Sequence, residues 1–143
     1  MRRENFAAWT DSEIVQFFRD ASIARAKCGF DATAANPIYD SKIIPAYQAL
    51  AARGPGAMRL LLALTDDPNP NVRMDAATLG YDADPECCRK TLLQVKDEPG
   101  IVAALALVGL LQKDSLFAAE FEREAREKHH KEMTQNRRQT DSE

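Results

Sequence analysis

An uninterrupted apolar run, IVAALALVGLL at residues 101–111, limits the folds open to this chain. Its eleven residues carry no charge, amide or hydroxyl. The run is too short to span a bilayer, which takes about 20 apolar residues, and as a helix it measures roughly 16 Å. Because a surface helix shows one apolar stripe, a helix that is apolar all round is expected to be covered on every side. We therefore expect the rest of the chain, or a partner, to wrap residues 101–111.

The composition of the 143-residue chain is that of a single globular domain, with 45% hydrophobic and 29% charged residues. Residues 1–38 carry five positive and five negative charges, residues 39–112 seven and nine, and residues 113–143 seven and eight. No segment is basic, which disfavours nucleic-acid binding. The N-terminal stretch lacks the apolar core of a secretory signal, so a cytoplasmic protein is expected.

Capping and breaking residues divide the chain into seven expected helices, and no alternating strand pattern is present. The first, over residues 10–28, opens with the capping box Thr10-Asp11-Ser12-Glu13. The second is expected to start at Asn36-Pro37 and to run to about Arg53, with Pro45 either kinking it or marking a later start. The others are expected at residues 58–64, 69–79, 84–96, 101–111 and 114–138.

A short internal repeat covers the middle of the chain. LLALTDDP at residues 61–68 aligns with LLQVKDEP at residues 92–99, at an offset of 31. After a two-residue contraction, Ala77, Leu79 and Gly80 align with Ala106, Val108 and Gly109 at an offset of 29. Each unit is a helix, an Asp/Pro turn and a second helix, which buries its apolar face only by stacking on a neighbour.

The run LLALTDDPNPNVR at residues 61–73, followed by Ala76-Ala77 and Leu79-Gly80, resembles a short HEAT-type repeat of roughly 30 residues. More broadly, residues 36–111 are similar to a small bacterial HEAT-like family whose domain has no assigned function. The positions that carry this similarity are Asn36, Tyr39, Leu50, Arg53-Gly54, Val72-Arg73 and Ala76-Ala77. The resemblance implies an α–α superhelix with a binding role, and it supplies no catalytic residues.

The same resemblance implies a structural ion pair. In HEAT repeats the arginine at the position of Arg73 pairs with an aspartate of a neighbouring turn, which here would be Asp97 or Asp66. The second unit has Val102-Ala103 at the matching place and lacks this arginine. A series of such ion pairs along successive units would therefore end after the first pair.

His129-His130 is the nearest approach to a metal-binding motif. Adjacent residues of a helix point about 100° apart, so the two imidazoles cannot bind one ion together. Glu127 and His130 share a helix face, but a zinc site needs three or four ligands. The favourable i, i+4 pairs of this segment, such as Glu122 with Arg126, explain it as a solvated polar helix. We predict no metal site.

The cysteines and acidic pairs have structural explanations as well. Cys87-Cys88 lacks the Cys-x-x-Cys spacing of a redox pair, and Cys88 lies in register with the core positions of its helix. The acidic groups Asp66-Asp67 and Asp82/Asp84/Glu86 stand where helices begin, and there carboxylates cap free N–H groups. No phosphate loop or nucleophile elbow is present, so we predict a protein that is not an enzyme and holds no cofactor.

These observations predict a right-handed all-α superhelix of about seven helices, built from HEAT-like helical pairs. Residues 1–125 are expected to form one domain, and residues 126–143 a polar helical extension or tail. Within the domain, residues 10–35 form the N-terminal helix and loop, 36–56 a degenerate repeat helix, 57–80 and 84–111 the HEAT-like units, and 113–125 a C-terminal capping helix. The aromatic residues Phe6, Trp9, Phe17 and Phe18 are expected to close the N-terminal end of the stack or, alternatively, to provide an exposed anchor.

The predicted function is a protein–protein interaction module whose partner is another protein of unknown identity. Arg73, Met74, Asp75 and Thr78 are expected to present the binding surface, with no role for nucleic acid or a membrane. Alternatives are a toxin-neutralising, immunity-type inhibitor, a nucleic-acid-handling HEAT protein and a lyase-type HEAT protein. Phe117 and Phe121 are expected to fold across residues 101–111, and the chain would then be a monomer. Otherwise that face serves a partner or forms a homodimer.

Overall fold

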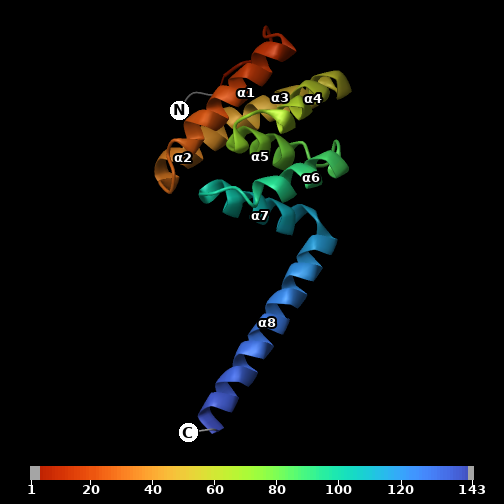
Figure 1. The fold of residues 1–143 in the computed structure, drawn as a ribbon. Coiled ribbons are helices and arrows are strands. Elements are labelled where there is room, and N and C mark those ends of the chain that lie inside the picture. Colours follow the sequence, from red (N-terminus) through yellow and green to blue (C-terminus); the bar gives the residue numbers. More distant parts are fainter. Residues whose placement is uncertain (1–3, 142–143) are drawn as a thin grey trace.

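The computed structural model describes residues 4–141, and over these residues it contains helices and no strand. The predicted all-α fold is therefore confirmed (Figure 1). A π-helical turn, η1 (Tyr39–Ile43), joins α2 to α3, and a 3-10 turn, η2 (Ala63–Asp66), extends α4, so the described residues form seven helical segments. The α-helices are α1 (Asp11–Ala26), α2 (Ala32–Ile38), α3 (Ile44–Arg53), α4 (Pro55–Leu62), α5 (Pro70–Leu79), α6 (Pro85–Val95), α7 (Ile101–Lys113) and α8 (Ser115–Asp141).

Most helix starts lie at the predicted capping residues. Thr10 and Glu13 form both hydrogen bonds of the capping box, each at 3.1 Å. Asn69 caps α5 and Asp84 caps α6 through side-chain oxygens that accept backbone N–H groups. Gly54 separates α3 from α4 with a φ of 102°, a conformation that side chains disfavour. Short polar side chains and glycine thus fix these boundaries from the sequence alone.

The predicted helix start at Asn36-Pro37 is wrong, because α2 begins one turn earlier, at Ala32. The carboxylate of Asp31 accepts hydrogen bonds from the first free N–H groups of α2, and this cap outweighs the single bond that Pro37 omits. The kink expected at Pro45 takes the form of the π-turn η1. There the N–H of Ile44 bonds to the carbonyl of Tyr39, five residues back, and α3 starts with Pro45 in its first turn.

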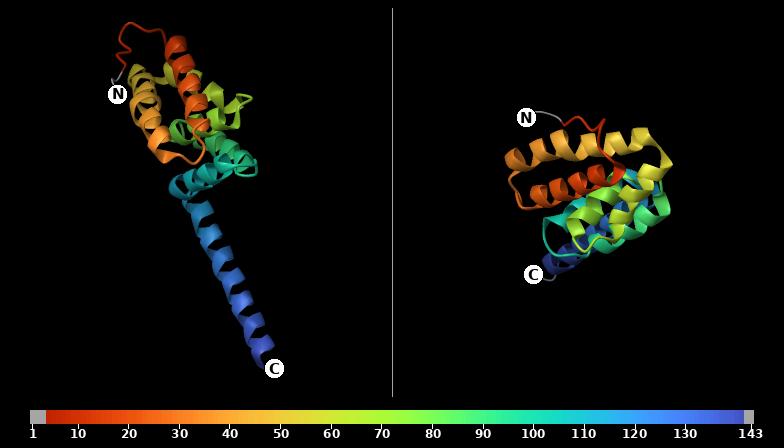
Figure 2. Two further views of the ribbon diagram at one scale, coloured as in Figure 1. Left: turned by 90° about the vertical axis from the view of Figure 1, so that its left-hand side faces the viewer. Right: turned by 90° about the horizontal axis from the view of Figure 1, so that it is seen from above.

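Two apolar clusters make up the core, and α5 contributes to both. The first holds the side chains of α1, α3 and α4 together with Ala76 of α5, and the second holds Met74 and Ala77 of α5 with those of α6 and α7. Both views in Figure 2 show these helices stacked into one body. The aromatic residues Phe6, Trp9 and Phe17 close the N-terminal end with ring centroids 5.0–5.4 Å apart, and Phe18 is fully buried. The predicted core role is confirmed for Phe6 and Phe18, and Trp9 and Phe17 pack against them half-buried.

The glycines that align in the internal repeat both lie against neighbouring helices. A Cβ atom on Gly80, which ends α5, would lie 2.8 Å from Leu62 of α4. A Cβ atom on Gly109 of α7 would lie 3.6 Å from Leu92 of α6 and 3.2 Å from Thr78 of α5. At Gly80 the missing side chain lets α5 approach α4 closely, whereas at Gly109 the tighter contact is with α5 and the contact with α6 is an ordinary van der Waals contact.

The structure differs from expectation at the C-terminal end. In α7 only Val102, Ala106, Gly109 and Leu110 are buried, so the apolar run is covered on one face and not on every side. The capping helix expected at residues 113–125 does not fold across α7. Instead, residues 115–141 form one continuous helix that leaves α7 at 112° and projects from the body (Figures 1 and 2).

The first turns of α8 make its contacts with the body. Phe117 packs against the second apolar cluster and stacks on Phe121, with ring centroids 6.3 Å apart. Phe117, Phe121 and Leu107 line one side groove, so the predicted contact with α7 is reduced to this corner. No single helix of residues 4–141 is long and apolar enough to cross a membrane; only the bent pair of α7 and α8, taken together, has the length and composition.

Candidate functional site

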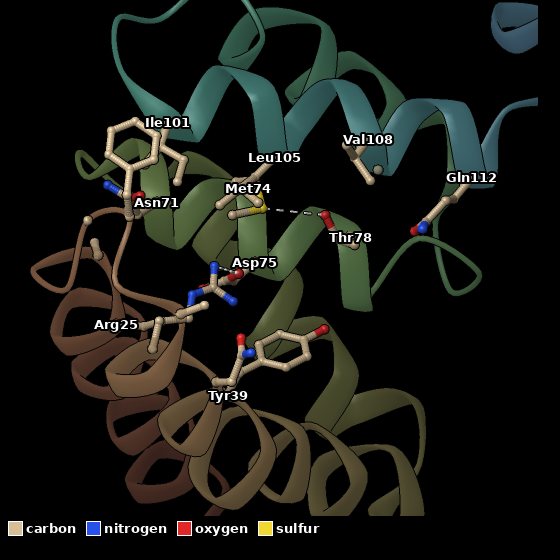
Figure 3. Close-up of a pocket in the computed structure, with 17 residues that line it drawn as sticks. Arg25, Tyr39, Asn71, Met74, Asp75, Thr78, Ile101, Leu105, Val108 and Gln112 are labelled. Carbon is tan, nitrogen blue, oxygen red and sulfur yellow. Dashed lines mark hydrogen bonds and ion pairs between the residues drawn. The ribbon is translucent and has the colours of Figure 1, made fainter.

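A groove of the body lies between the α1–α2 corner, α5 and α7. It has a volume of about 370 Å³. Figure 3 shows Arg25 and Tyr39 along one wall, Ile101, Leu105, Val108 and Gln112 of α7 along the other, and α5 between them. The remaining lining residues are Ala26, Gly29, Phe30, Ala32, Ala35, Asn36, Asn71, Met74, Asp75, Thr78 and Gly109. Elements from both ends of the sequence therefore build this one surface.

The rim of the groove exposes large apolar side chains. Phe30, in the turn between α1 and α2, is 86% exposed, and Leu105 and Val108 of α7 are 39% and 48% exposed. Ile101, Leu105, Val108 and Gln112 recur every three or four residues, so they form one stripe along α7. The stripe extends over roughly 16 Å. Apolar side chains gathered around one groove are typical of an interaction surface.

The floor of the groove is polar and internally paired. Asp75 of α5 is buried, and its carboxylate accepts a hydrogen bond from Arg25 and another from the hydroxyl of Ser22, both at 2.5 Å. The guanidinium of Arg25 also lies over the ring of Tyr39, 5.0 Å from the centroid. Burial raises the pKa of Asp75, while Arg25 and Ser22 oppose that shift. Burial likewise raises the pKa of Tyr39, with the nearby Asp75 adding to it.

This pairing limits the chemistry of the groove. Among the described residues that line it, the titratable side chains are Arg25, Tyr39 and Asp75. The one carboxylate is held by a guanidinium and a hydroxyl, and no histidine or cysteine stands beside it to complete a nucleophile–base pair. The arrangement is suited to binding an apolar group next to a fixed, neutralised polar floor.

Three of the four predicted binding residues of α5 line the groove, and the fourth, Arg73, lies outside it. Met74, Asp75 and Thr78 line the groove, but Met74 and Asp75 are buried and form its floor. Thr78 donates a hydrogen bond to the sulfur of Met74, at 3.7 Å. Arg73 does not line the groove. Helix α5 lies between two layers of helices, so Met74 and Asp75 face neighbouring helices, whereas Thr78 is half-buried at the groove.

Arg73 forms a structural pair, but with a different partner from those predicted. Its Nη2 lies 3.2 Å from Oε1 of Glu98, and its Nη1 donates to the carbonyl oxygens of Asp67 and Pro68. Asp97 instead lies 3.1 Å from Lys96, and Asp66 is exposed in η2. The two carbonyls fix the guanidinium in a direction that reaches the longer side chain of Glu98. Arg73 thus joins the turn before α5 to the turn before α7.

The other candidate groups lie outside the groove. His129 and His130 are exposed on α8, and no three histidine, cysteine or acidic side chains of the described residues converge as metal ligands. Cys88 is fully buried, as predicted, and burial raises the pKa of its thiol to about 12. Cys87 is partly exposed, with its sulfur 3.6 Å from the Thr65 hydroxyl. None of these groups shares a cavity with the polar floor.

Sequence reasoning missed Phe30, Arg25 and Tyr39. Phe30 had a local signal, because an aromatic residue between Gly29 and Asp31 has no helical register to bury it. Arg25 and Tyr39 had none, since their roles depend on the approach of α1 and η1 to α5.

No family model, curated protein or solved structure matches the chain.

Proposed function

We propose that this protein is a non-enzymatic interaction module whose groove binds an apolar helical segment of another protein. The observation that carries the proposal is the exposed rim formed by Phe30, Leu105 and Val108 around one elongated groove. A stripe of α7 with i, i+4 and i+7 spacing offers the ridges against which a second helix packs. Recognition of an amphipathic helix by an apolar groove is a common mode of peptide binding.

The internal repeat supports the same proposal. The aligned glycines Gly80 and Gly109 lie against the preceding helices α4 and α6, and α7 packs on α5 as well as on α6. We infer a short HEAT-like arrangement from this packing and from the sequence resemblance. In repeat stacks of this kind, the concave face between successive second helices serves as a binding surface.

The pairing of the polar floor favours binding over catalysis. A catalytic carboxylate needs access to a substrate atom within about 3 Å, whereas the Asp75 carboxylate is already occupied by Ser22 and Arg25. The rim side chains Phe30, Leu105 and Val108 themselves offer no donors to hold a charged metabolite. A partner helix placing two or three apolar side chains on Leu105, Val108 and Phe30 would cover the surface that the body leaves open.

The test compares two leucines of equal exposure. Leu105 lies in the groove and is 39% exposed, and Leu60 lies outside it, on α4, and is 41% exposed. Displayed peptides selected on the full chain are expected to be amphipathic helices. They should lose at least about tenfold in affinity for Leu105→Asp, because burying an unpaired carboxylate costs more than 1.4 kcal/mol. Their affinity for Leu60→Asp should not change.

Two outcomes would overturn this proposal. One is selection of peptides that bind both variants and the wild-type chain equally well, which would place the binding surface elsewhere. The other is turnover of a metabolite by the purified chain in an unbiased activity screen. Circular dichroism of both variants shows that each remains folded, so a loss of affinity is assigned to the groove.

A further inference from the structure

Beyond its first turns, helix α8 extends away from the body and covers none of it. It has 27 residues, and every described side chain from Ala119 to Thr140 is exposed. At 1.5 Å per residue it is roughly 40 Å long, and its free part receives no tertiary support (Figure 1). Because isolated helices are marginal in water and most helices are stabilised by packing on one face, a partner for α8 is expected.

The charges of α8 are divided between its two halves. Residues 115–127 carry four glutamates and two arginines, for a net charge of −2. Residues 128–140 carry two lysines, two arginines and one glutamate, for a net charge of +3 with the histidines neutral. Two such helices placed side by side in parallel bring like halves together. Placed antiparallel, each acidic half faces a basic half.

One face of α8 is almost free of charge along its whole length. Its residues recur at intervals of three or four, so they form a single stripe. They are Ala118, Phe121, Ala125, His129, Met133, Asn136 and Thr140. His129 stands at the centre of the stripe, with Ala125 and Met133 one turn away on either side. In an antiparallel pair that crosses at His129, the small Ala125 of one helix faces the large Met133 of the other.

We propose that two copies of this chain associate through α8, antiparallel and crossing near His129. In this register, Arg137 of the second copy lies one residue along the helix from the level of Glu122, and Glu132 lies two residues from the level of Lys128, so both pairs are within reach of their long side chains. Each contact occurs twice, because a two-fold axis makes the surface self-complementary. The favourable pairs flank the uncharged stripe, as the charged positions of antiparallel helix pairs do.

The side groove at the root of α8 fits the same arrangement. It has a volume of about 470 Å³ and is lined by Leu107, Phe117 and Phe121 together with the acidic Glu120 and Glu124. The basic end of the second α8, with Arg137 and Arg138, comes level with Phe121 and Glu122. At both ends of the contact, the basic end of one α8 therefore lies beside the acidic and apolar side chains at the root of the other. This surface is separate from the groove between α1 and α7, and the proposal does not depend on that groove.

Sedimentation equilibrium of the full chain with reciprocal charge variants tests the arrangement. The wild-type chain is expected to form dimers that weaken as salt is raised. Glu122→Lys/Glu124→Lys and Arg137→Glu/Arg138→Glu should each weaken self-association about tenfold or more, because each places like charges opposite one another. Mixing the two variants should restore a heterodimer, because in the antiparallel register the altered halves face each other.

The control is Asp40→Lys/Glu86→Lys, which makes the same change in net charge as Glu122→Lys/Glu124→Lys but at two exposed acids of the body. It should dimerise as the wild-type chain does, and Leu105→Asp should dimerise as well. A wild-type chain that stays monomeric, a dimer that the α8 variants leave unchanged, or a mixture that forms no heterodimer would each overturn the proposal. Far-ultraviolet circular dichroism of the variants reports whether α8 itself remains helical.

Discussion

Helices α5 and α7 carry the aligned second stretches of the internal sequence repeat, and the more polar of these two helices is the more deeply buried. Helix α5 carries Arg73 and Asp75, yet Val72, Met74, Asp75, Ala76 and Ala77 are all buried. Helix α7 has eleven consecutive apolar residues, yet Leu105 and Val108 remain exposed on it. The more polar helix is therefore the more deeply buried of the two.

The difference shows that position in the stack decides burial. Helix α5 packs on α1 and α4 on one side and on α6 and α7 on the other, so polar residues there must be paired internally. Helix α7 is the last helix of the body, and the next helix, α8, turns away from it. An apolar face at the end of a stack is thus left as surface, which is the basis of the proposed binding groove.

The largest expected change in unfolding free energy comes from removing the charge of Asp75 in α5. The matched comparison adds a charge at Ala104, the aligned position in α7. Asp75→Ala leaves the Arg25 guanidinium, whose side chain is 14% exposed, without its carboxylate. Removing one partner of a buried pair costs about 3–5 kcal/mol of unfolding free energy. Ala104→Asp adds a charge to an exposed position and should cost less than about 1 kcal/mol.

Urea unfolding followed by circular dichroism measures both changes. Equal costs at the two positions would show that α5 and α7 share one environment, against the comparison drawn from the structure. Asp75→Asn separates charge from hydrogen bonding, because the amide can still accept from Ser22. The unfolding free energy of Asp75→Asn should lie between that of the wild-type chain and that of Asp75→Ala.

A second comparison stays within α7 and contrasts its two faces. Leu110 is fully buried in the second apolar cluster, and Leu105 is 39% exposed in the groove. Leu110→Ala should lower the unfolding free energy by about 2–5 kcal/mol, through lost apolar burial and the cavity left behind. Leu105→Ala should lower it by less than about 1 kcal/mol. Similar losses from both variants would mean that α7 is covered on all sides, as its sequence alone suggested.

Local rules predicted the helices well because their causes are local. The capping box at Thr10, the caps at Asn69 and Asp84 and the break at Gly54 each depend on residues within one turn. The core role of Cys88 followed from helical spacing in the same way. Where two local rules competed, at Asp31 and at Asn36-Pro37, the wrong cap was chosen.

The candidate site was harder to predict, because its parts meet only in three dimensions. The sequence predicts a binding surface at Arg73, Met74, Asp75 and Thr78, but whether a helix face meets solvent depends on its neighbours. The buried contact between Arg25 and Asp75 joins residues 50 positions apart, and no spacing rule reports such a distance. The direction of α8 likewise depends on the turn at Asp114, where one residue in an extended conformation separates two helices.

A third comparison concerns the aligned glycines. A Cβ atom at Gly80 would lie 2.8 Å from both Leu62 and the carbonyl oxygen of Ala76, so Gly80→Ala forces backbone to shift and should cost about 1–3 kcal/mol. At Gly109 the nearest atom is the Thr78 hydroxyl, 3.2 Å away, and alanine is the better helix former by about 1 kcal/mol. Gly109→Ala should therefore be nearly neutral. Thermal unfolding of the two variants measures the contrast, and a large loss at Gly109 would mean that α7 packs as tightly on α5 as α5 does on α4.

The smallest expected effect concerns the carboxylates beside the ends of the two helices, Asp67 before α5 and Asp114 after α7. The N–H of Phe117 lowers the pKa of Asp114; burial opposes this shift, and the ion pair with Arg89, at 2.5 Å, adds to it. At Asp67, burial raises the pKa, but hydrogen bonds from Arg19 and from the N–H of Asn69 outweigh it, and the pKa is lowered.

A carboxyl whose pKa is lower in the folded than in the unfolded chain stabilises the fold above its ordinary pKa of about 3.9, and that stability is lost as the pH falls through the folded value. The unfolding free energy of the wild-type chain should therefore decline below about pH 4. Asp114→Asn keeps a capping side chain but loses the charge pair with the half-exposed Arg89, so it should cost less than about 1 kcal/mol at neutral pH. Because the variant has no carboxyl to protonate at this position, its stability should converge on that of the wild-type chain as the pH falls. Urea unfolding at a series of pH values measures this convergence, and a constant difference across the series would show that Asp114 acts through its shape and not through its charge.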